Sequence, residues 1–308
     1  MTLSMINFFN LIRWKNLLLI VLVQILIKYA LIERFTNDFT LNTLEFIFLV
    51  LATVCIASAG NIINDIYDVE TDLVNNPDNI IVGDSISEKT ALNLFIIFNV
   101  IGVGLGFYLS NLVGKSGFSA IFVIISALLY IYATYLKQTL LIGNLVISVL
   151  VALSIIIVGL FDLLPAISFQ NQQSHLNIFK IILDYSIFAF FLNLLREIIK
   201  DIEDINGDYK AEMKTLPILI GRERTTLLVF ILSFVPLFVL IYYITTYWYM
   251  QPLGVLYFLV FVVAPIIYFT IKAYSASSKR DLHHLSNVLK LAILFGVLSL
   301  LLYPILKI

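Results

Sequence analysis

The feature that most constrains this chain is a succession of apolar runs, each long enough to cross a lipid bilayer. Nine such runs are separated by short polar breaks, at residues 16–33, 43–63, 91–110, 118–136, 140–161, 179–199, 226–246, 253–272 and 288–306. A transmembrane helix needs roughly 20 mainly apolar residues, and lipid offers no partner for an unpaired backbone amide. The sequence therefore predicts an all-α polytopic membrane protein, with nine transmembrane helices in a single domain over residues 1–308.

The composition excludes several other classes of protein. Hydrophobic residues make up 61% of the chain and charged residues 13%, and the mean hydropathy is +1.01, which a soluble domain of this length cannot accommodate. The net charge of -1 gives no basic surface, so we expect no nucleic-acid partner. Cys55 is the single cysteine, so an intrachain disulfide and a Cys/His zinc site are not expected. The run after Lys15 has no small-residue cleavage site, which favours a retained first span over a signal peptide.

The distribution of basic residues predicts the orientation. With the N-terminus in the cytoplasm, 14 of the 19 basic residues fall on the cytoplasmic side: Arg13, Lys15, Lys89, Lys137, Arg196, Lys200, Lys210, Lys214, Arg222, Arg224, Lys272, Lys279, Arg280 and Lys290. The other side holds five: Lys28, Arg34, Lys115, Lys180 and Lys307. This asymmetry follows the positive-inside rule. We therefore expect a cytoplasmic N-terminus, in the inner or plasma membrane of the cell.

Two acidic stretches follow the second and sixth apolar runs, on the predicted cytoplasmic side. Three aspartates in each stretch share the spacing i, i+3, i+7: Asp65, Asp68 and Asp72 in the first, and Asp201, Asp204 and Asp208 in the second. On a helix, this spacing puts three carboxylates on one face, although Gly207 could end the second helix early and leave Asp208 in a turn. A constant offset of 136 residues relates the two sets. This indicates an internal repeat, and such repeats often build a site at their interface.

Six neighbouring carboxylates repel one another, so the pattern predicts a bound cation. Oxygen ligands without sulfur or imidazole favour Mg²⁺ over zinc, and Mg²⁺ usually shares its coordination shell with substrate phosphates. Lys137, Lys200 and Lys214 are candidates to neutralise the remaining phosphate charge. Tyrosines that precede Lys137, at positions 130, 132 and 135, either stabilise a carbocation through their ring faces or lie at the lipid interface.

At these residues the sequence resembles the UbiA superfamily of intramembrane prenyltransferases. Its first motif, Asn-Asp-x-x-Asp-x-x-x-Asp, is matched by Asn64, Asp65, Asp68 and Asp72, and its second by Asp201, Asp204 and Asp208. The tyrosine-rich segment that ends at Lys137, followed by Gly143-Asn144, is also similar to the family. The stretch from Arg196 to Gly221 and the N-terminal Arg13-Trp14-Lys15-Asn16 resemble the branch that includes geranylgeranylglyceryl-phosphate geranylgeranyltransferases.

The resemblance implies a fold of nine transmembrane helices and Mg²⁺-dependent prenyl transfer. It implies a prenyl diphosphate donor, a lipophilic or glycerol-phosphate acceptor and contact with membrane lipid. The implied metal ligands are Asn64, Asp65, Asp68, Asp72, Asp201, Asp204 and Asp208. Asn16, Lys137, Arg196 and Lys200 are the implied substrate-binding residues, and Asp68, Asp204 and Lys137 the implied catalytic residues.

One departure from the family concerns the loop after the first motif, where many members place basic residues around a proline. This chain has the uncharged Asn76 and Asn79 on either side of Pro77 and Asp78. Two alternative functions use similar residues. Intramembrane carboxylates and repeats also mark cation transporters, and CDP-alcohol phosphotransferases also use Asp-rich motifs with Mg²⁺, although their Asp-Gly-x-x-Ala-Arg element does not occur in this sequence.

Overall fold

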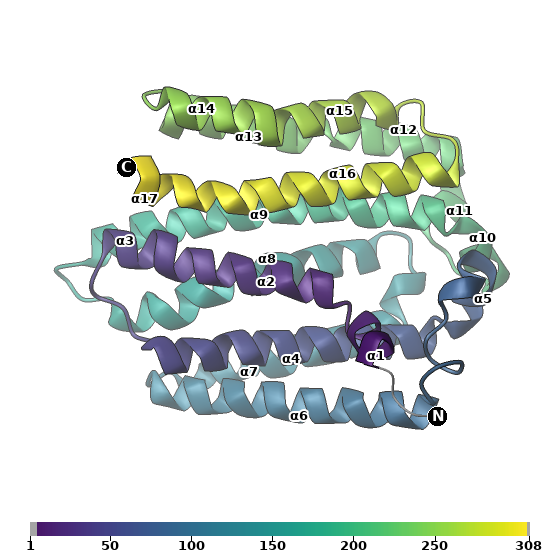
Figure 1. Ribbon diagram of the computed structural model, residues 1–308, viewed down its shortest axis with the longest axis horizontal. Coiled ribbons are helices and arrows are strands. Elements are labelled where there is room, and N and C mark those ends of the chain that lie inside the picture. The colour runs from purple at the N-terminus through teal and green to yellow at the C-terminus, as the bar shows by residue number, and fades with distance from the viewer. Residues whose placement is uncertain (1–4, 307–308) are drawn as a thin grey trace.

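The protein is an all-helical bundle in a computed structural model that describes residues 5–306 (Figure 1). Within that range, nine helical stretches are long and apolar enough to cross a membrane: Trp14–Phe35, Thr43–Tyr67, Glu88–Leu112, Ser116–Thr134, Ile142–Ala166, Gln172–Glu203, Arg222–Trp248, Pro252–Ala273 and Lys279–Leu306. Each overlaps one of the nine predicted runs. The fold class predicted from the sequence is therefore confirmed.

Most spans are built from consecutive helical segments. In the first half of the chain, the helices within and between the spans are α1 (Met5–Leu11), α2 (Trp14–Ile25), η1 (Leu26–Ile32), α3 (Glu33–Phe35), α4 (Thr43–Tyr67), α5 (Val69–Asn75), η2 (Pro77–Asn79), α6 (Glu88–Leu112), η3 (Ser116–Phe118), α7 (Ser119–Thr134), η4 (Leu136–Gln138), α8 (Ile142–Asp162) and η5 (Leu164–Ala166). In the second half they are α9 (Gln172–Glu203), α10 (Ile205–Lys210), α11 (Leu216–Ile220), α12 (Arg222–Leu232), α13 (Phe234–Tyr243), η6 (Ile244–Trp248), α14 (Pro252–Phe258), η7 (Leu259–Val263), α15 (Ala264–Ala273), α16 (Lys279–Leu298), η8 (Ser299–Leu301) and α17 (Leu302–Leu306).

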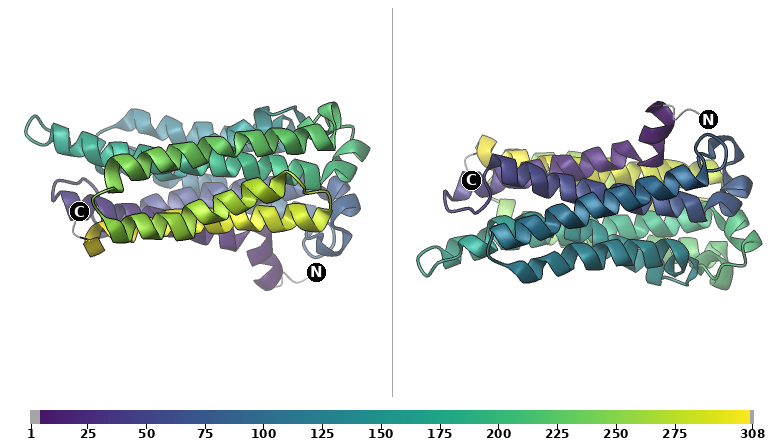
Figure 2. Two further views of the ribbon diagram at one scale, coloured as in Figure 1. Left: turned by 90° about the horizontal axis from the view of Figure 1, so that it is seen from above. Right: turned by 90° about the horizontal axis from the view of Figure 1, so that it is seen from below.

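The spans run side by side along the long axis of the molecule (Figures 1 and 2). Helix α9 packs against α8 and α16, and α4 packs against α6 and α7. One cluster of buried apolar side chains draws members from all nine spans, whereas α6 and α7 bury little of their surface within the protein. In a bilayer, α6 and α7 therefore give much of their apolar surface to lipid.

The short helices that follow the two acidic stretches gather at one end of the bundle. Helices α5, α10 and α11 lie there together, close to α1, while α3 and α17 lie at the opposite end (Figure 1). The alternation of the nine spans puts Lys28, Arg34, Lys115 and Lys180 on the half toward the α3 end, as the sequence predicts. Lys307, the fifth residue of that predicted group, lies outside the described residues.

Both acidic stretches break at their middle aspartate, which the sequence reading did not anticipate. Helix α4 ends at Tyr67, and Asp68 has φ -97° and ψ -2° before α5 begins. Helix α9 ends at Glu203, and Asp204 has φ -96° and ψ 6° before α10 begins. The expectation of one continuous helical face is wrong, because the third aspartate of each set lies on a second, short helix. The same break 136 residues apart agrees with an internal repeat.

Gly207 has a different role from the one expected. It lies inside α10 rather than ending α9, so Asp208 belongs to a helix and not to a turn. A Cβ at this position would come within 2.3 Å of the Asn75 amide and 2.8 Å of the Thr71 carbonyl oxygen. Glycine is therefore needed for the close approach of α10 to α5 and not for a helix end.

Candidate active site

Arg13 connects the N-terminal segment to the first acidic stretch. Its Nη2 lies 2.8 Å from Oδ1 of Asp65, in the last turns of α4. The backbone of Arg13 is left-handed, with φ 53° and ψ 50°, which is uncommon for a residue with a side chain and often marks a functional site. The carboxylate of Asp65 raises the pKa of the Arg13 guanidinium above its usual value. Arg13 was not among the predicted site residues, although it stands in the N-terminal motif that carried the resemblance.

Asp68 receives two donors from different elements. Lys137, from η4, pairs with Oδ1, and the amide of Asn64 donates to Oδ2. The Lys137 side chain is 8% exposed, so its charge is held inside the protein beside that carboxylate. The side-chain carbonyl oxygen of Asn64 is buried and has no hydrogen-bond donor. The structure thus brings the predicted site residues Asn64, Asp68 and Lys137 together, and it leaves the side-chain oxygen of Asn64 without a hydrogen-bond donor.

The second acidic stretch is held from α8 and from within α9. Asn144 of α8 donates to Oδ2 of Asp201 at 2.8 Å. Glu197, one turn before Asp201, lies 2.9 Å from the Arg196 guanidinium and 4.0 Å from the Lys200 ammonium. Asn144 was singled out in the sequence only as part of the Gly143-Asn144 pair, and its contact explains why an amide stands at that position.

The Asn75 side chain joins the two stretches directly. Its amide nitrogen donates to the backbone carbonyl of Asp204 at 2.9 Å, and its carbonyl oxygen accepts from the backbone amide of Gly207 at 2.9 Å. One side chain from α5 thus satisfies a carbonyl and an amide at the break between α9 and α10. This contact fixes the two aspartate sets relative to each other across 129 to 132 residues of sequence.

The carboxylates outside the membrane spans are crowded enough to alter their acidity. Burial raises the pKa of Asp72 to about 6, and the charges of Asp68, Asp65 and, from the second stretch, Asp204 add to this shift. Burial and then the charge of Asp204 raise the pKa of Asp208 to about 7. Burial also raises the pKa of Asp204, with a contribution from Asp68. Each stretch therefore experiences the negative charge of the other.

The donor set suits a hard divalent cation that shares its shell with a substrate. Among residues 5–306, no three acidic, histidine or cysteine side chains already converge on one point as a closed cage. Mg²⁺ does not require one, because it retains waters and is usually held by one or two carboxylates together with substrate phosphates. The unsatisfied oxygen of Asn64 beside Asp68 is a ready oxygen ligand of this kind.

The structure separates the other predicted residues into those near the carboxylates and those away from them. Tyr132 lies within electrostatic range of Glu197, Asp201 and Asp68, whereas Tyr130 and Tyr135 are 43% and 65% exposed. Asn16 is exposed in the first turn of α2, one turn after Arg13. Lys214 is exposed as well, and its backbone amide donates to the carbonyl of Gln138 in η4.

The loop around Pro77 receives a cation from the far end of the sequence. The ammonium of Lys279, the first residue of α16, donates to the backbone carbonyl of Asn75 and lies 3.3 Å from Oδ1 of Asn76. The sequence reading noted the absence of basic residues in this loop. It had no means of finding a lysine 203 residues away that contacts it.

Comparison with known proteins gives a consistent result. The UbiA prenyltransferase family matches residues 21–294. A digeranylgeranylglyceryl phosphate synthase from Methanosphaera stadtmanae is 33% identical over 259 residues, which cover 82% of this chain and 86% of that protein. This match favours the prenyltransferase reading over the transporter and CDP-alcohol phosphotransferase alternatives.

Solved structures share the fold. A UbiA homolog from Aeropyrum pernix in its apo form superimposes with a TM-score of 0.68 at 14% identity, over 94% of this chain and 97% of that one. A UbiA homolog from Archaeoglobus fulgidus bound to GPP and Mg²⁺ gives a TM-score of 0.56 at 17% identity, over 96% and 99%.

Proposed function

Since this chain belongs to the UbiA prenyltransferase family, we propose that it transfers a geranylgeranyl group from its diphosphate to the free hydroxyl of a singly prenylated glycerol phosphate. The relative from Methanosphaera stadtmanae carries the name of the corresponding synthase. The proposed product is a diether lipid of the membrane in which the enzyme is embedded. The acceptor is the specific part of this proposal, since prenyl transfer itself follows from the family.

The observation that carries the proposal is the joining of two equivalent aspartate breaks by Asn75. Asp68 and Asp204 adopt nearly the same backbone conformation at the ends of their spans, and Asn75 holds the two ends together. Two sets of carboxylates are thereby presented to one region at the membrane surface. A diphosphate with its metal needs such an arrangement, because its charge otherwise remains in a medium of low dielectric.

We propose Mg²⁺ as the cofactor, held by residues of the two acidic stretches: Asn64, Asp65, Asp68, Asp72, Asp201, Asp204 and Asp208. The A. fulgidus homolog bound to GPP and Mg²⁺ supports the choice of ion. When bound, the ion supplies Lewis-acid stabilisation of the charge that develops on the departing diphosphate. The unsatisfied Asn64 oxygen is the feature of this chain that fits such an ion.

The residues of the chain do the remaining work of binding and orientation. Lys137 is held beside Asp68, where its ammonium can exchange that carboxylate for a diphosphate oxygen and stabilise the leaving group. The bond between C1 of the prenyl group and the diphosphate oxygen breaks, and its electron pair leaves with the diphosphate. The ring of Tyr132, in the tyrosine-rich segment that ends at Lys137, is the candidate to stabilise the allylic cation through its face.

Capture by the acceptor completes the reaction. A lone pair of the acceptor hydroxyl forms the new C–O ether bond at C1, and the hydroxyl proton passes to the diphosphate that has just left. No separate side-chain base is required in this scheme, because the diphosphate oxygens accept the proton.

The test is a transfer assay with purified protein in lipid nanodiscs. Geranylgeranyl diphosphate and geranylgeranylglyceryl phosphate are supplied with Mg²⁺, and an aromatic acid acceptor is tested in parallel. We expect the diether product with the glycerol phosphate, and loss of product with EDTA. Product with the aromatic acceptor alone would contradict the proposed acceptor and leave prenyl transfer intact.

We also propose that residues 1–308 form one domain with a cytoplasmic N-terminus, in the inner or plasma membrane. The charge asymmetry supports this orientation, and the helical alternation brings Asp84, Lys210 and Ser278 to the end that carries α5 and α10. Cysteines introduced singly at these positions in a Cys55→Ala background should all react with a membrane-impermeant maleimide from the cytoplasmic side. Labelling of any one from the other side would contradict the topology.

A further inference from the structure

The start of α8 and the short helix before it contact both acidic stretches. Lys137 of η4 pairs with Oδ1 of Asp68 in the first stretch. Seven residues later, Asn144 in the first turn of α8 donates through its amide nitrogen to Oδ2 of Asp201 in the second stretch, at 2.8 Å. One short piece of chain therefore reaches an aspartate of each set.

Gly143 allows η4 to lie directly against the first turn of α8. A Cβ at Gly143 would come within 2.7 Å of the carbonyl oxygen of Leu136 and 3.0 Å of Cα of Lys137. Both neighbours are backbone atoms, so a side chain at position 143 would push the two segments apart. The close packing holds Lys137 and Asn144 at a fixed separation, and with them the aspartates that they contact.

Asn144 is itself held in a packed environment. It is 7% exposed, and its backbone carbonyl accepts a hydrogen bond from Oγ of Ser148 at 2.6 Å. Asn193 of α9 donates to the same Ser148 oxygen at 3.3 Å, which ties α8 to α9 one turn further along α8. Buried side chains in such packing have little freedom to change rotamer, so the amide of Asn144 approaches Asp201 from a fixed direction.

An amide donor suits a carboxylate that binds a metal ion. The terminal torsion of aspartate has a broad preference, so a carboxylate without a fixed partner samples many orientations. The hydrogen bond from Asn144 engages Oδ2 of Asp201, and Oδ1 can then face an ion. Because the amide is neutral, it orients the carboxylate without cancelling its negative charge. Asp65, the equivalent aspartate of the first stretch, is instead paired with the charged Arg13.

We propose that Asn144 is a positioning residue for the divalent metal ion, which it serves by orienting Asp201. The inference rests on the proposed function and deepens it, since it gives the second arm of the site a residue that lies outside both aspartate motifs. Side chains that hydrogen-bond to metal ligands orient those ligands, and their loss typically weakens metal binding about 10- to 100-fold. The contact at 2.8 Å between Asn144 and Asp201 is of this kind.

The experiment measures Mn²⁺ binding by electron paramagnetic resonance, with geranylgeranyl diphosphate present and no acceptor. Mn²⁺ is the probe because it takes the same oxygen ligands as Mg²⁺. We expect Asn144→Ala to weaken Mn²⁺ binding about 10-fold or more. Asn144→Leu, which keeps the volume of the side chain and removes the donor, should do the same, and it carries the test if Asn144→Ala is unstable. Ser148→Ala is the matched control, because it removes the hydrogen bond between α8 and α9 and keeps the Asn144 amide, so it should bind Mn²⁺ like wild type.

A double variant shows whether Asn144 acts through Asp201. Changes to two residues in contact are not additive, so Asn144→Ala should add less than about twofold to the loss of Mn²⁺ binding already caused by Asp201→Ala. A further loss as large as in the wild-type background overturns the inference.

Two other results also overturn it: wild-type Mn²⁺ affinity in an Asn144 variant whose elution and thermal midpoint show it to be folded, and an equal loss in Ser148→Ala, which would assign the effect to packing. If wild type forms no diether lipid while Mn²⁺ binding responds as expected, the proposed acceptor fails and the role of Asn144 stands.

Discussion

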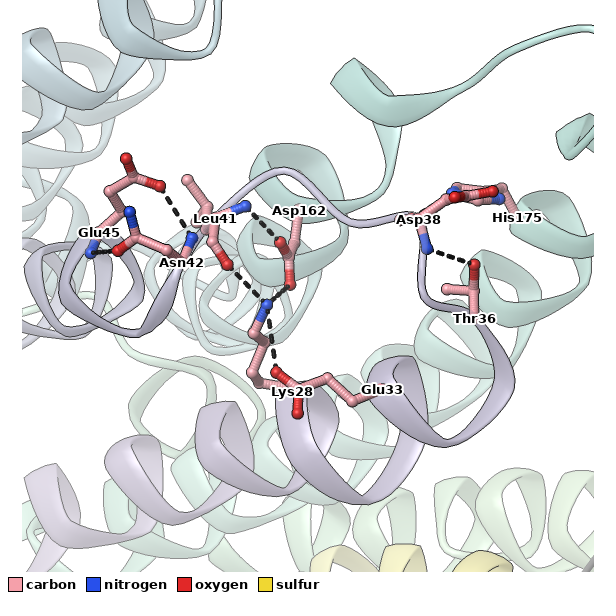
Figure 3. A network of polar contacts seen from close by, with 9 residues as sticks. All are labelled: Lys28, Glu33, Thr36, Asp38, Leu41, Asn42, Glu45, Asp162 and His175. Carbon is pink, nitrogen blue, oxygen red and sulfur yellow. Dashed lines mark hydrogen bonds and ion pairs between the residues drawn. The ribbon is translucent and has the colours of Figure 1, made fainter.

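Two groups of charged side chains lie at opposite ends of the bundle, and they differ in how completely their charges are paired. At the α3 end, Lys28 of η1 and Asp162 of α8 are both fully buried and form an ion pair of 2.8 Å (Figure 3). At the α5 and α10 end, Asp72 and Asp208 have raised pKa values, the Asn64 side-chain oxygen has no hydrogen-bond donor, and the carboxylates of the two sets repel one another. Both groups consist of ionisable residues in or next to membrane spans, so the type of residue does not explain the difference.

The pair at the α3 end is complete. Lys28 also donates to the backbone carbonyl of Leu41 at 2.8 Å and lies 3.6 Å from the carboxylate of Glu33. The second carboxylate oxygen of Asp162 accepts from the backbone amide of Leu41 at 2.8 Å. The pair thus fastens the segment between the first two spans to the end of α8 (Figure 3). His175 of α9 contacts the carbonyl of Asp38 in the same segment at 2.8 Å.

The comparison gives a physical criterion for telling structure from function in this protein. A buried charge whose hydrogen bonds are all made within the chain holds helices together and has nothing left to offer a ligand. A cluster with excess charge of one sign is unfavourable until a ligand of opposite charge arrives. By that criterion we propose that the Lys28–Asp162 pair is a structural clamp and that the aspartate end is the binding site.

The strongest test of the comparison is to remove one aspartate from the binding end. Asp204→Ala or Asp68→Ala should lower transfer about 1,000-fold or more, because several kcal/mol of stabilisation of the leaving group is lost, at 1.36 kcal/mol per factor of ten. The thermal midpoint of Asp204→Ala should not fall, since the change removes a repelling charge, whereas Asp68→Ala also leaves the buried Lys137 without its partner and should lower the midpoint. Product formation at saturating Mg²⁺ is the measurement. Asp84→Ala, in an exposed loop, is the control, and full activity in either variant would contradict a site with two arms.

The converse change at the clamp should affect stability and not chemistry. Asp162→Ala leaves Lys28 buried without its partner, and breaking such a pair costs about 3–5 kcal/mol. Unfolding in mixed detergent micelles measures this loss. The double variant Lys28→Met with Asp162→Leu should recover most of it, because two apolar side chains need no partner. The fraction that remains folded should keep the wild-type turnover, and a loss of turnover there would assign the clamp a part in catalysis.

A third change tests the link between the two arms. Asn75→Ala removes hydrogen bonds to Asp204 and Gly207, each with a net contribution of about 1 kcal/mol. We expect kcat/KM to fall about 10- to 30-fold, which corresponds to roughly 1.4–2 kcal/mol, and more Mg²⁺ to be needed for half-maximal rate. Asn111→Ala, whose side chain bonds only to its own helix at the opposite end, is the control. An unchanged Mg²⁺ requirement would show that α10 is held by its other contacts.

The sequence was sufficient for the features that depend on composition and spacing. The nine spans follow from apolar length, because only a helix satisfies its own backbone in lipid. The repeat follows from the offset of 136 residues between the aspartates. The breaks at Asp68 and Asp204 were missed, because the spacing i, i+3, i+7 is equally compatible with an unbroken helix. Asn75 bonds to Asp204 and Gly207 at the second break, and that contact exists only in the folded protein.

The missed residues share one property, which is that their partners are distant in sequence. Arg13 meets Asp65 across 52 residues, and Lys28 meets Asp162 across 134. In the sequence, Lys28 served only as evidence for orientation, and Arg13 only for orientation and for the family resemblance. The count of basic residues predicts on which side of the membrane a residue lies, but it does not predict which carboxylate that residue pairs with. Tertiary packing supplies that information, and with it the distinction between a clamp and a site.

The smallest expected effect concerns the loop at Pro77, where the family commonly has basic residues and this chain has Asn76 and Asn79. A hydrogen bond to phosphate contributes roughly 1.5–3 kcal/mol from a charged donor and about 1 kcal/mol from a neutral one. Asn79→Arg should therefore tighten donor binding by about 1 kcal/mol, or roughly fivefold, and the gain should shrink as salt rises. Asn76→Arg should gain less, because Lys279 already lies 3.3 Å from Asn76 and would repel a second cation. Titration of each variant with geranylgeranyl diphosphate at two salt concentrations measures both gains.

The outcomes for Lys279 complete this test. If Lys279→Gln weakens donor binding while neither arginine strengthens it, Lys279 alone supplies the positive charge of this loop. If none of the three changes donor affinity, the loop does not contact the diphosphate, and Lys137 and Arg13 remain as the cations paired with the proposed metal ligands.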